Sequence, residues 1–385
     1  MSRLIDQFVR NEEERTRVRQ VEELAARFSE RAAAHDRDGS FPFENFADLR
    51  DAGYLKITVP KAYGGDELPL YELVLLQERL AYGDGSTALA VGWHVGQILH
   101  LRSVRKWPTP LFEQLCRDIV SDGAMINTFA SEAATGSPTR GGRPETTAVR
   151  TEGGWLISGR KTFSTLSPIL DRFVVSAFVP EEDRTDEFLV RKSDRVTVLE
   201  TWDTLGMRAT GSHDVVLDRA FAEEGARIVG KGEDDGGGWL LHIPACYAGI
   251  ALAARDFAVR YAQDYRPNYL TGPLSEVQTV QQTIGRMEAE LRTARTLLYA
   301  AADRWDREPE NRARMKPELG LAKHIVTNSA IQVVDLAMRI VGGASLSRSM
   351  PLERYYRDVR AGLHNPPMDN MVLQMLAAEA LKEER

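Results

Sequence analysis

The stretch TAVRTEGGWLISGRKTFST, residues 147–165, decides how the middle of the chain folds. Residues 147–150 and 155–157 contain β-branched and large apolar side chains, which favour strands. Between these two runs lies Glu152-Gly-Gly154, and a glycine pair in that position is typical of a tight turn. The sequence therefore predicts a β-hairpin here.

Further short strands are expected after the hairpin. Residues 173–179 form an apolar run rich in valine and phenylalanine, and the valine-containing segments 196–198 and 215–217 follow. Strands that are separated by turns, with little helical periodicity, are typical of a small antiparallel barrel or sandwich. We therefore expect a central β domain over residues 121–236.

Helical periodicity flanks this β domain on both sides. Apolar side chains recur at three- and four-residue spacing over residues 70–82, and the repeat is longest over residues 277–301. Such stripes are the buried faces of packed helices. The expected fold class is α+β, with an N-terminal helical domain over residues 1–120 and a C-terminal four-helix bundle over residues 237–385.

The composition excludes several classes of protein. The 385 residues include 49 Lys or Arg and 56 Asp or Glu, which gives a formal net charge of −7. Because binding to a phosphate backbone needs clustered cations, nucleic acid is not an expected partner. The two cysteines, Cys116 and Cys246, are far apart, so neither a disulfide framework nor a metal site is expected.

No segment of the sequence suggests a membrane. The first residues are broken by charges and have no apolar signal-peptide core. The most apolar stretch, Ile243–Ala254, is shorter than the roughly 20 residues that span a bilayer. The expectation is a cytoplasmic protein without a membrane partner.

Four groups of residues resemble the acyl-CoA dehydrogenase superfamily in their order and spacing. They are residues 49–65 with 84–90, residues 131–137 with 153–165, residues 205–212, and residues 340–343 with 354–360. The resemblance covers nearly the whole chain. It implies the three domains described above, a flavin between the β domain and the bundle, and a homo-oligomer, a dimer of dimers, in which a neighbouring subunit completes the cofactor site.

The resemblance implies which β-domain residues contact the flavin ring. A turn rich in small residues lets backbone N–H groups approach a ligand closely, and the turn at Gly136 and Ser137 is of this kind. Hydroxyl groups and aromatic side chains nearby would tune the ring. The residues expected to line it are Phe129, Ser131, Phe163, Ser164 and Thr165.

The bundle residues that the family uses for the pyrophosphate and adenine of FAD are changed here. Arg266 keeps the arginine of an Arg-x-x-Phe-Gly motif, but Tyr269 replaces the phenylalanine and the glycine is lost. Arg339 stands where a glutamine is usual, before Gly342 and Gly343. An arginine can still pair with phosphate. FAD is therefore the expected cofactor, and FMN remains an alternative.

The catalytic residues depart further from the family. Its usual base is a glutamate eight residues after the Asp of an Arg–Asp pair, and counting from Asp358 this position is Pro366, which cannot accept a proton. The nearest groups able to take a polar role are His364 and Asp369. His94 lies on a helix that faces the flavin in relatives. These histidines resemble those of the reduced-flavin monooxygenase branch, although each could also be an ordinary core residue.

Three functions therefore remain open. The first is α,β-dehydrogenation of an acyl-CoA thioester with hydride transfer to FAD, with an electron-transfer flavoprotein as acceptor. The alternative is a two-component monooxygenase, which takes reduced flavin from a flavin reductase and acts on a small organic substrate. A third hypothesis is a flavin-binding subunit without catalysis. The missing glutamate favours the second and third hypotheses over the first, but the sequence leaves all three open.

Overall fold

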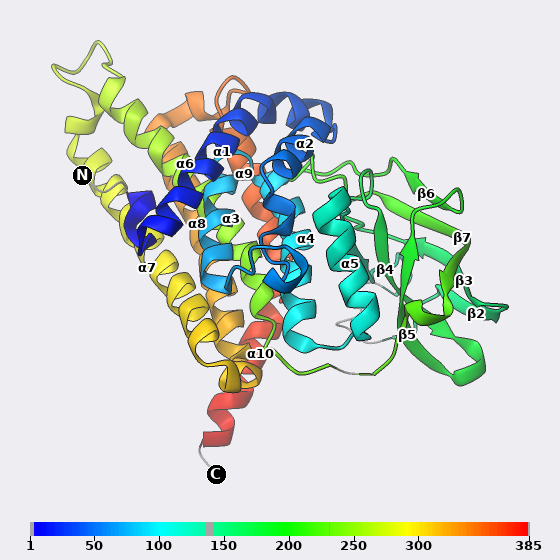
Figure 1. Ribbon diagram of the computed structural model, residues 1–385. Helices are drawn as coiled ribbons and strands as arrows, with labels where there is room; N and C mark the ends of the chain where they lie inside the picture. The colour runs from blue at the N-terminus through cyan, green and yellow to red at the C-terminus, as the bar shows by residue number, and fades with distance from the viewer. Residues whose placement is uncertain (1–3, 136–141, 231, 384–385) are drawn as a thin grey trace.

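Helices and strands occupy different parts of the molecule. The computed structural model describes residues 4–135, 142–230 and 232–383. The strands gather on one side and the helices form the rest, with α4 and α5 nearest the strands (Figure 1). The N-terminal helices are α1 (Glu12–Asp38), α2 (Phe43–Asp51), α3 (Leu70–Gly83), α4 (Gly85–Val104) and α5 (Thr109–Asp122).

The N-terminal helices have well-defined ends. The side chain of Asn11 accepts a hydrogen bond from the backbone N–H of Glu14 at the start of α1, and Gly39 ends that helix with a φ of 64°. Asp84 caps α4 by accepting from the backbone N–H groups of Ser86 and Thr87. Because α4 is apolar almost all round, it is buried in the middle of the molecule.

The central region is a sheet of eight strands in the order β6-β7-β3-β2-β4-β5-β8, with β1 paired to β4. The predicted hairpin is present: β2 and β3 are antiparallel and Gly153 turns between them with a φ of 75°. The strands are β1 (Ile126–Phe129), β2 (Thr147–Thr151), β3 (Gly154–Lys161), β4 (Arg172–Val179), β5 (Arg184–Arg191), β6 (Val196–Leu199), β7 (Asp214–Glu223) and β8 (Arg227–Ile228).

The expectation of a purely antiparallel sheet was wrong at two places. β1 pairs with β4 in parallel, and β2 makes a single parallel bridge to β4 between Thr147 and Phe178. Parallel neighbours need a crossover connection, and the β2–β3 hairpin supplies part of it because it lies between β1 and β4 in the sequence. The remaining pairings are antiparallel.

The C-terminal part is a helical bundle. α6 packs against α8, and α8 against α7. α8 is long and apolar enough to cross a membrane by length and composition, but half of its most apolar window is buried inside this bundle. The helices are α6 (His242–Asp264), α7 (Gln278–Arg307), α8 (Lys316–Val341), α9 (Leu352–Val359) and α10 (Asp369–Glu383).

The two helical parts share one core. α3 packs against α6, and the fully buried carboxylate of Glu78 accepts two hydrogen bonds from Arg295 of α7, at 2.8 Å each, and one from Tyr299. A buried charge needs such partners. The α+β fold class is confirmed. We keep residues 1–120, 121–236 and 237–385 as proposed domain limits.

Candidate functional site

A cluster of hydroxyl groups lies on the edge of the β domain. The segment between β3 and β4 brings the Thr165 hydroxyl to 2.8 Å from the Ser212 hydroxyl. Ser212 in turn lies 2.8 Å from the Thr210 hydroxyl, which donates to the carbonyl of Met207. Two segments far apart in the sequence thus present neutral donors and acceptors at one place. We call Thr165, Thr210 and Ser212 the hydroxyl cluster.

The residues just before Thr165 are held in an unusual conformation. Phe163 has a φ of 55° and its side chain is 69% exposed, with its ring edge-on to Trp202 at 5.8 Å. A large aromatic ring that is exposed beside polar groups is typical of a surface that a ligand covers. The hydroxyl of Ser164 is buried and has no hydrogen-bond partner among the described residues. An unpaired polar atom of this kind also fits a site that accepts a ligand.

A buried ion pair fixes the end of β1 beside β3. The carboxylate of Glu132 accepts from Lys161 Nζ at 2.6 Å and from the Thr146 hydroxyl at 2.6 Å. The carbonyl of Ser131 accepts from the backbone N–H of Thr162, at 2.9 Å, so Ser131 lies beside the segment that carries Phe163. The ion pair was not expected from the sequence.

Three of the predicted flavin contacts on this side are not found at a ligand-facing position among the described residues. The side chain of Phe129 packs against Phe173 in the core and is only 2% exposed, so it offers no ring to a ligand. Gly136 and Ser137 lie outside the described residues.

The loop between β6 and β7, which carries Thr210 and Ser212 of the hydroxyl cluster, is fastened to α9. The backbone N–H of Met207 donates to Asp358 Oδ1 at 2.6 Å, and a Cβ at Gly206 would lie 2.3 Å from the carbonyl oxygen of Arg357, so only glycine allows this approach. Burial raises the pKa of Asp358 to about 7, although Arg354 and the Met207 N–H oppose the shift.

The segment between α9 and α10 contains the residues predicted to replace the family's base. His364 is exposed, and its ring makes no hydrogen bond within the described chain. The adjacent Asn365 accepts a hydrogen bond from the Tyr247 hydroxyl at 2.5 Å, which ties this segment to α6. The peptide bond between Pro366 and Pro367 is cis. His364, whose ring has no hydrogen bond among the described residues, is therefore two positions before Pro366, and the immediate neighbours of Pro366 are Asn365 and Pro367.

Asp369 is engaged in contacts with α8. Its carboxylate lies 2.9 Å from the side-chain amide of Asn328, 3.1 Å from His324 Nδ1 and 3.6 Å from the buried Nζ of Lys323. Burial disfavours the charged form, but the bonds from Asn328 and His324 and the charge of Lys323 outweigh it and lower the pKa of Asp369. This carboxylate holds the first turn of α10, and the structure does not favour it as a base.

His94 is a structural residue of the interior. Its Nε2 donates to the carbonyl of Leu55 at 3.0 Å, and its Nδ1 accepts from the backbone N–H of Ile126 at 3.2 Å. Burial lowers the pKa of His94 to about 4, so the ring is neutral and joins α4 to β1. Both ring nitrogens are occupied, and the predicted catalytic role of His94 finds no support.

The predicted bundle residues lie on exposed surface. Tyr269 is 77% exposed, Arg266 is exposed, and Arg339 pairs with Asp335 at 2.7 Å. A Cβ at either Gly342 or Gly343 would meet open space, so these glycines leave room at the end of α8. Within the described chain no hydrogen bond joins these residues to the β-domain groups.

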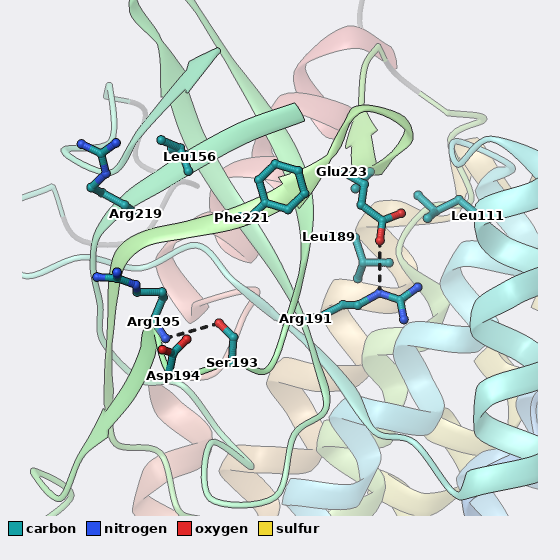
Figure 2. Close-up of a pocket in the computed structure, with 11 residues that line it drawn as sticks. Leu111, Leu156, Leu189, Arg191, Ser193, Asp194, Arg195, Arg219, Phe221 and Glu223 are labelled. Carbon is teal, nitrogen blue, oxygen red and sulfur yellow. Dashed lines mark hydrogen bonds and ion pairs between the residues drawn. The ribbon is translucent and has the colours of Figure 1, made fainter. Parts of the chain in front are cut away.

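A pocket on the β domain, with Leu111 of α5 at one side of it, is separate from all of these residues. It has a volume of about 500 Å³ and lies over β5 and β7, with Phe221 and Leu156 beside it (Figure 2). Arg191 reaches Glu223 across it at 3.8 Å (Figure 2). None of the predicted site residues lines this pocket.

In the sequence, the β domain that carries the hydroxyl cluster lies between an N-terminal helical region and a C-terminal helical bundle. Three family models match this chain in that order. They are "Acyl-CoA dehydrogenase, N-terminal domain" over residues 11–104, "Acyl-CoA dehydrogenase, middle domain" over residues 127–220 and "Acyl-CoA dehydrogenase, C-terminal domain" over residues 241–363.

Individual relatives that are similar over nearly the whole chain have names that indicate different reactions. The chain is 48% identical over 379 residues, covering 97% of this chain and 99% of the relative, to "Putative acyl-CoA dehydrogenase YdbM" of Bacillus subtilis (strain 168). It is 33% identical over 393 residues, covering 96% and 91%, to L-evernosamine nitrososynthase of a Micromonospora species. The solved structure of KijD3 in complex with FMN and dTDP-3-amino-2,3,6-trideoxy-4-keto-3-methyl-D-glucose has a TM-score of 0.86 at 28% identity, and the match covers 97% of this chain and 94% of that one.

The chain belongs to the acyl-CoA dehydrogenase family, whose members are flavin-dependent oxidoreductases. The resemblance that the sequence motifs indicated is confirmed. The structure brings Thr165 together with Ser212 and Thr210, which were not predicted as site residues. Their signal was present, because both belong to the resembling segment 205–212, but no pattern within that segment showed which hydroxyl would meet Thr165.

Proposed function

We propose that this protein is a reduced-flavin-dependent monooxygenase that acts on a small organic substrate. The proposal rests on the residues found between α9 and α10, where the family's usual glutamate is absent. This segment offers the unengaged imidazole of His364 and has a proline at position 366, while Asp369 is bound to α8. Removal of a weakly acidic α-proton needs a base, and the carboxylate nearest to position 366, that of Asp369, is held by Asn328 and ion-paired with α8, which disfavours it as that base.

The β-domain edge fits a flavin. The hydroxyl cluster supplies neutral donors and acceptors for the polar side of an isoalloxazine ring, and the exposed ring of Phe163 supplies an apolar contact. Family membership supports the same cofactor. We propose FAD, with FMN as the alternative because the solved structure of KijD3 contains FMN.

When bound in its reduced form, the flavin supplies the chemistry that activates oxygen. The protein's own contribution is positioning. His364 can donate or accept one hydrogen bond at either ring nitrogen, and this is the property needed to hold an oxygen-derived group or a substrate proton. Asn365, fixed by the Tyr247 hydroxyl, keeps the segment in place.

Similarity to a nitrososynthase and to KijD3, rather than to dehydrogenases alone, supports the proposal of a monooxygenase. We propose a flavin reductase as the source of electrons, because the proposed reaction consumes reduced flavin. Similarity to a relative named as an acyl-CoA dehydrogenase favours the second candidate, which is α,β-dehydrogenation of an acyl-CoA thioester with an electron-transfer flavoprotein as partner. For either reaction we propose a cytoplasmic dimer of dimers, in which Arg266, Tyr269, Arg339 and the glycines that follow α8, Gly342 and Gly343, face a second subunit.

Optical spectra of the flavin-loaded protein separate the candidates. The protein is reduced by dithionite and mixed with air-saturated buffer in a stopped-flow instrument, and separately the oxidised protein is mixed with acyl-CoA thioesters of several chain lengths. A monooxygenase should show a delayed return of the oxidised spectrum and no bleaching by any thioester. Bleaching by a thioester at a rate comparable with turnover would sink the proposal in favour of dehydrogenation.

The role of His364 is tested by His364→Ala. We expect a loss of about 10²–10⁴-fold in coupled product formation, the usual contribution of a positioned acid or base, with peroxide released in its place. His35→Ala is the matched control, because His35 is bonded to Ser40 and Glu44 of the N-terminal region. Unaltered coupling in His364→Ala would remove this residue from the site.

A further inference from the structure

A cavity lies at the other end of the loop between β6 and β7. It has a volume of about 670 Å³, and its walls come from the end of α1, from residues 204–208 and from residues 348–357. Among the described residues that line it, none belongs to the hydroxyl cluster or to residues 364–369. The cavity is therefore distinct from the site on which the proposed function depends.

The lining of this cavity is strongly basic. It contains five arginines but only two carboxylates, those of Asp36 and Glu353, which leaves an excess of three positive charges. The whole chain has a formal net charge of −7, so this cavity differs in sign from the molecule as a whole. A concave site with excess positive charge has a positive electrostatic potential, which attracts anions. The five arginines are Arg37, Arg208, Arg348, Arg354 and Arg357.

The two carboxylates are used by a single arginine. Arg357 pairs with Asp36 at 2.5 Å and with Glu353 at 2.8 Å. Arg208 is satisfied differently, since it contacts Asp203 at 2.9 Å and donates to the backbone carbonyls of Thr204 and Asp36. These two arginines hold the walls together and are not free to bind a ligand.

Arg354 is buried, with 7% of its surface exposed, and it lines the cavity. In the described chain no carboxylate lies within 4.0 Å of its guanidinium, whose hydrogen-bonding neighbour is the Tyr355 side chain, with the ring centroid of Tyr355 at 5.3 Å. The carboxylates of Asp84 and Asp358 act on it only through space. A guanidinium has five N–H donors, so a buried one without a paired carboxylate keeps donors for an anion. Arg348, on the exposed rim, likewise has no ion pair in the described chain.

We propose that this cavity binds a phosphate-bearing small molecule with at least two negative charges, such as a nucleoside diphosphate. The planar fork of a guanidinium matches phosphate oxygens in pairs. The volume lies within the range of about 300–1,000 Å³ that small-molecule sites occupy. Arg354 contacts the phosphate from the buried wall and Arg348 from the rim. The inference does not depend on the reaction that the protein catalyses.

Calorimetric titration of the flavin-loaded protein tests the site, with inorganic pyrophosphate and ADP as probes at low ionic strength. We expect one site per chain, with flavin retained. Arg348→Ala should weaken binding about tenfold or more, because a charge-assisted bond is lost. Arg354→Gln should weaken it further. Arg195→Ala, an exposed arginine beside the other pocket, is the control and should bind as the unmodified protein does.

Four outcomes would overturn the proposal. They are the absence of binding heat, equal weakening by Arg195→Ala, release of flavin as pyrophosphate binds, and tighter binding of malonate than of pyrophosphate. The third would place the anion in the cofactor site, and the fourth would show a carboxylate site. If Arg354→Gln does not fold, Arg348→Ala still decides, because its side chain is exposed and unpaired in the described chain.

Discussion

The junction between α4 and β1 and the segment between α9 and α10 each contain a histidine that the sequence marked as catalytic. At the junction, His94 is fully buried and both of its ring nitrogens are bonded to backbone groups. In the segment, His364 is exposed and its ring has no hydrogen bond within the described chain. One histidine is occupied by the fold, and the other is available for chemistry.

The difference teaches that a histidine whose two ring nitrogens are both bonded to the backbone is a poor candidate for catalysis. Two carboxylates show a different contrast, because both are bonded but their pKa values shift in opposite directions. Asp369 is bound to three side chains of α8, whereas Asp358, used only as a counting reference, is buried and has a pKa of about 7. Perturbed or unpaired groups mark places where the structure tolerates a cost.

The largest expected effect is on stability, from His94→Ala. It removes a buried ring and leaves the Leu55 carbonyl and the Ile126 N–H unpaired, so the free energy of unfolding should fall by about 4 kcal/mol. Chemical denaturation measures it. A loss below about 1 kcal/mol would show that His94 is not a structural residue, and the proposed difference between His94 and His364 would then be wrong.

The next effect concerns the pH dependence of stability. The carboxyl of Asp358 has a pKa of about 7 in the folded protein and an ordinary value of 3.8, so between these pH values the folded state binds more protons than the unfolded state. Stability should therefore fall as pH rises through this window, by about 2–4 kcal/mol from this group. Asp358→Asn should flatten that decline, which denaturation curves at pH 4.5 and 8 compare. Parallel profiles of the two proteins would contradict the assignment.

A smaller loss is expected from Asp369→Asn. The substitution leaves the buried Nζ of Lys323 without its carboxylate, and we expect a loss of about 1–3 kcal/mol at pH 7. Because the pKa of Asp369 is lowered, its contribution is present above the ordinary pKa and disappears as pH falls through the folded value. The double variant with Lys323→Met should recover part of the loss. Strict additivity of the two substitutions would show that the pair does not interact.

The smallest effect on stability should come from His364→Ala, although its effect on coupling is expected to be large. An exposed side chain without partners contributes within about 0.5 kcal/mol to the free energy of unfolding. Thermal unfolding of the flavin-loaded variant measures this, with His94→Ala in parallel. Destabilisation of His364→Ala as severe as that of His94→Ala would make both histidines structural and would end the comparison.

Much of the fold could be predicted because its signals are local. The glycine pair at 153–154 predicted the hairpin, and apolar stripes predicted the long helices α3 and α7. The parallel pairing of β1 with β4 was missed, because register between strands that are distant in sequence depends on the whole sheet. For the site, the motifs predicted Thr165, but Ser212 and Asp358 became site residues only through contacts over more than 40 positions.

The sequence by itself determined the order of helices and strands, the family motifs and the loss of the glutamate at position 366, because each is written in residue type and spacing. Only the tertiary structure decided which polar groups are free. His94 and His364 have the same side chain, and their chemical roles differ because one ring lies between two backbone groups and the other lies at the surface. The basic cavity at Arg354 arises in the same way, since three distant segments meet there and leave one buried guanidinium without a carboxylate within 4.0 Å in the described chain.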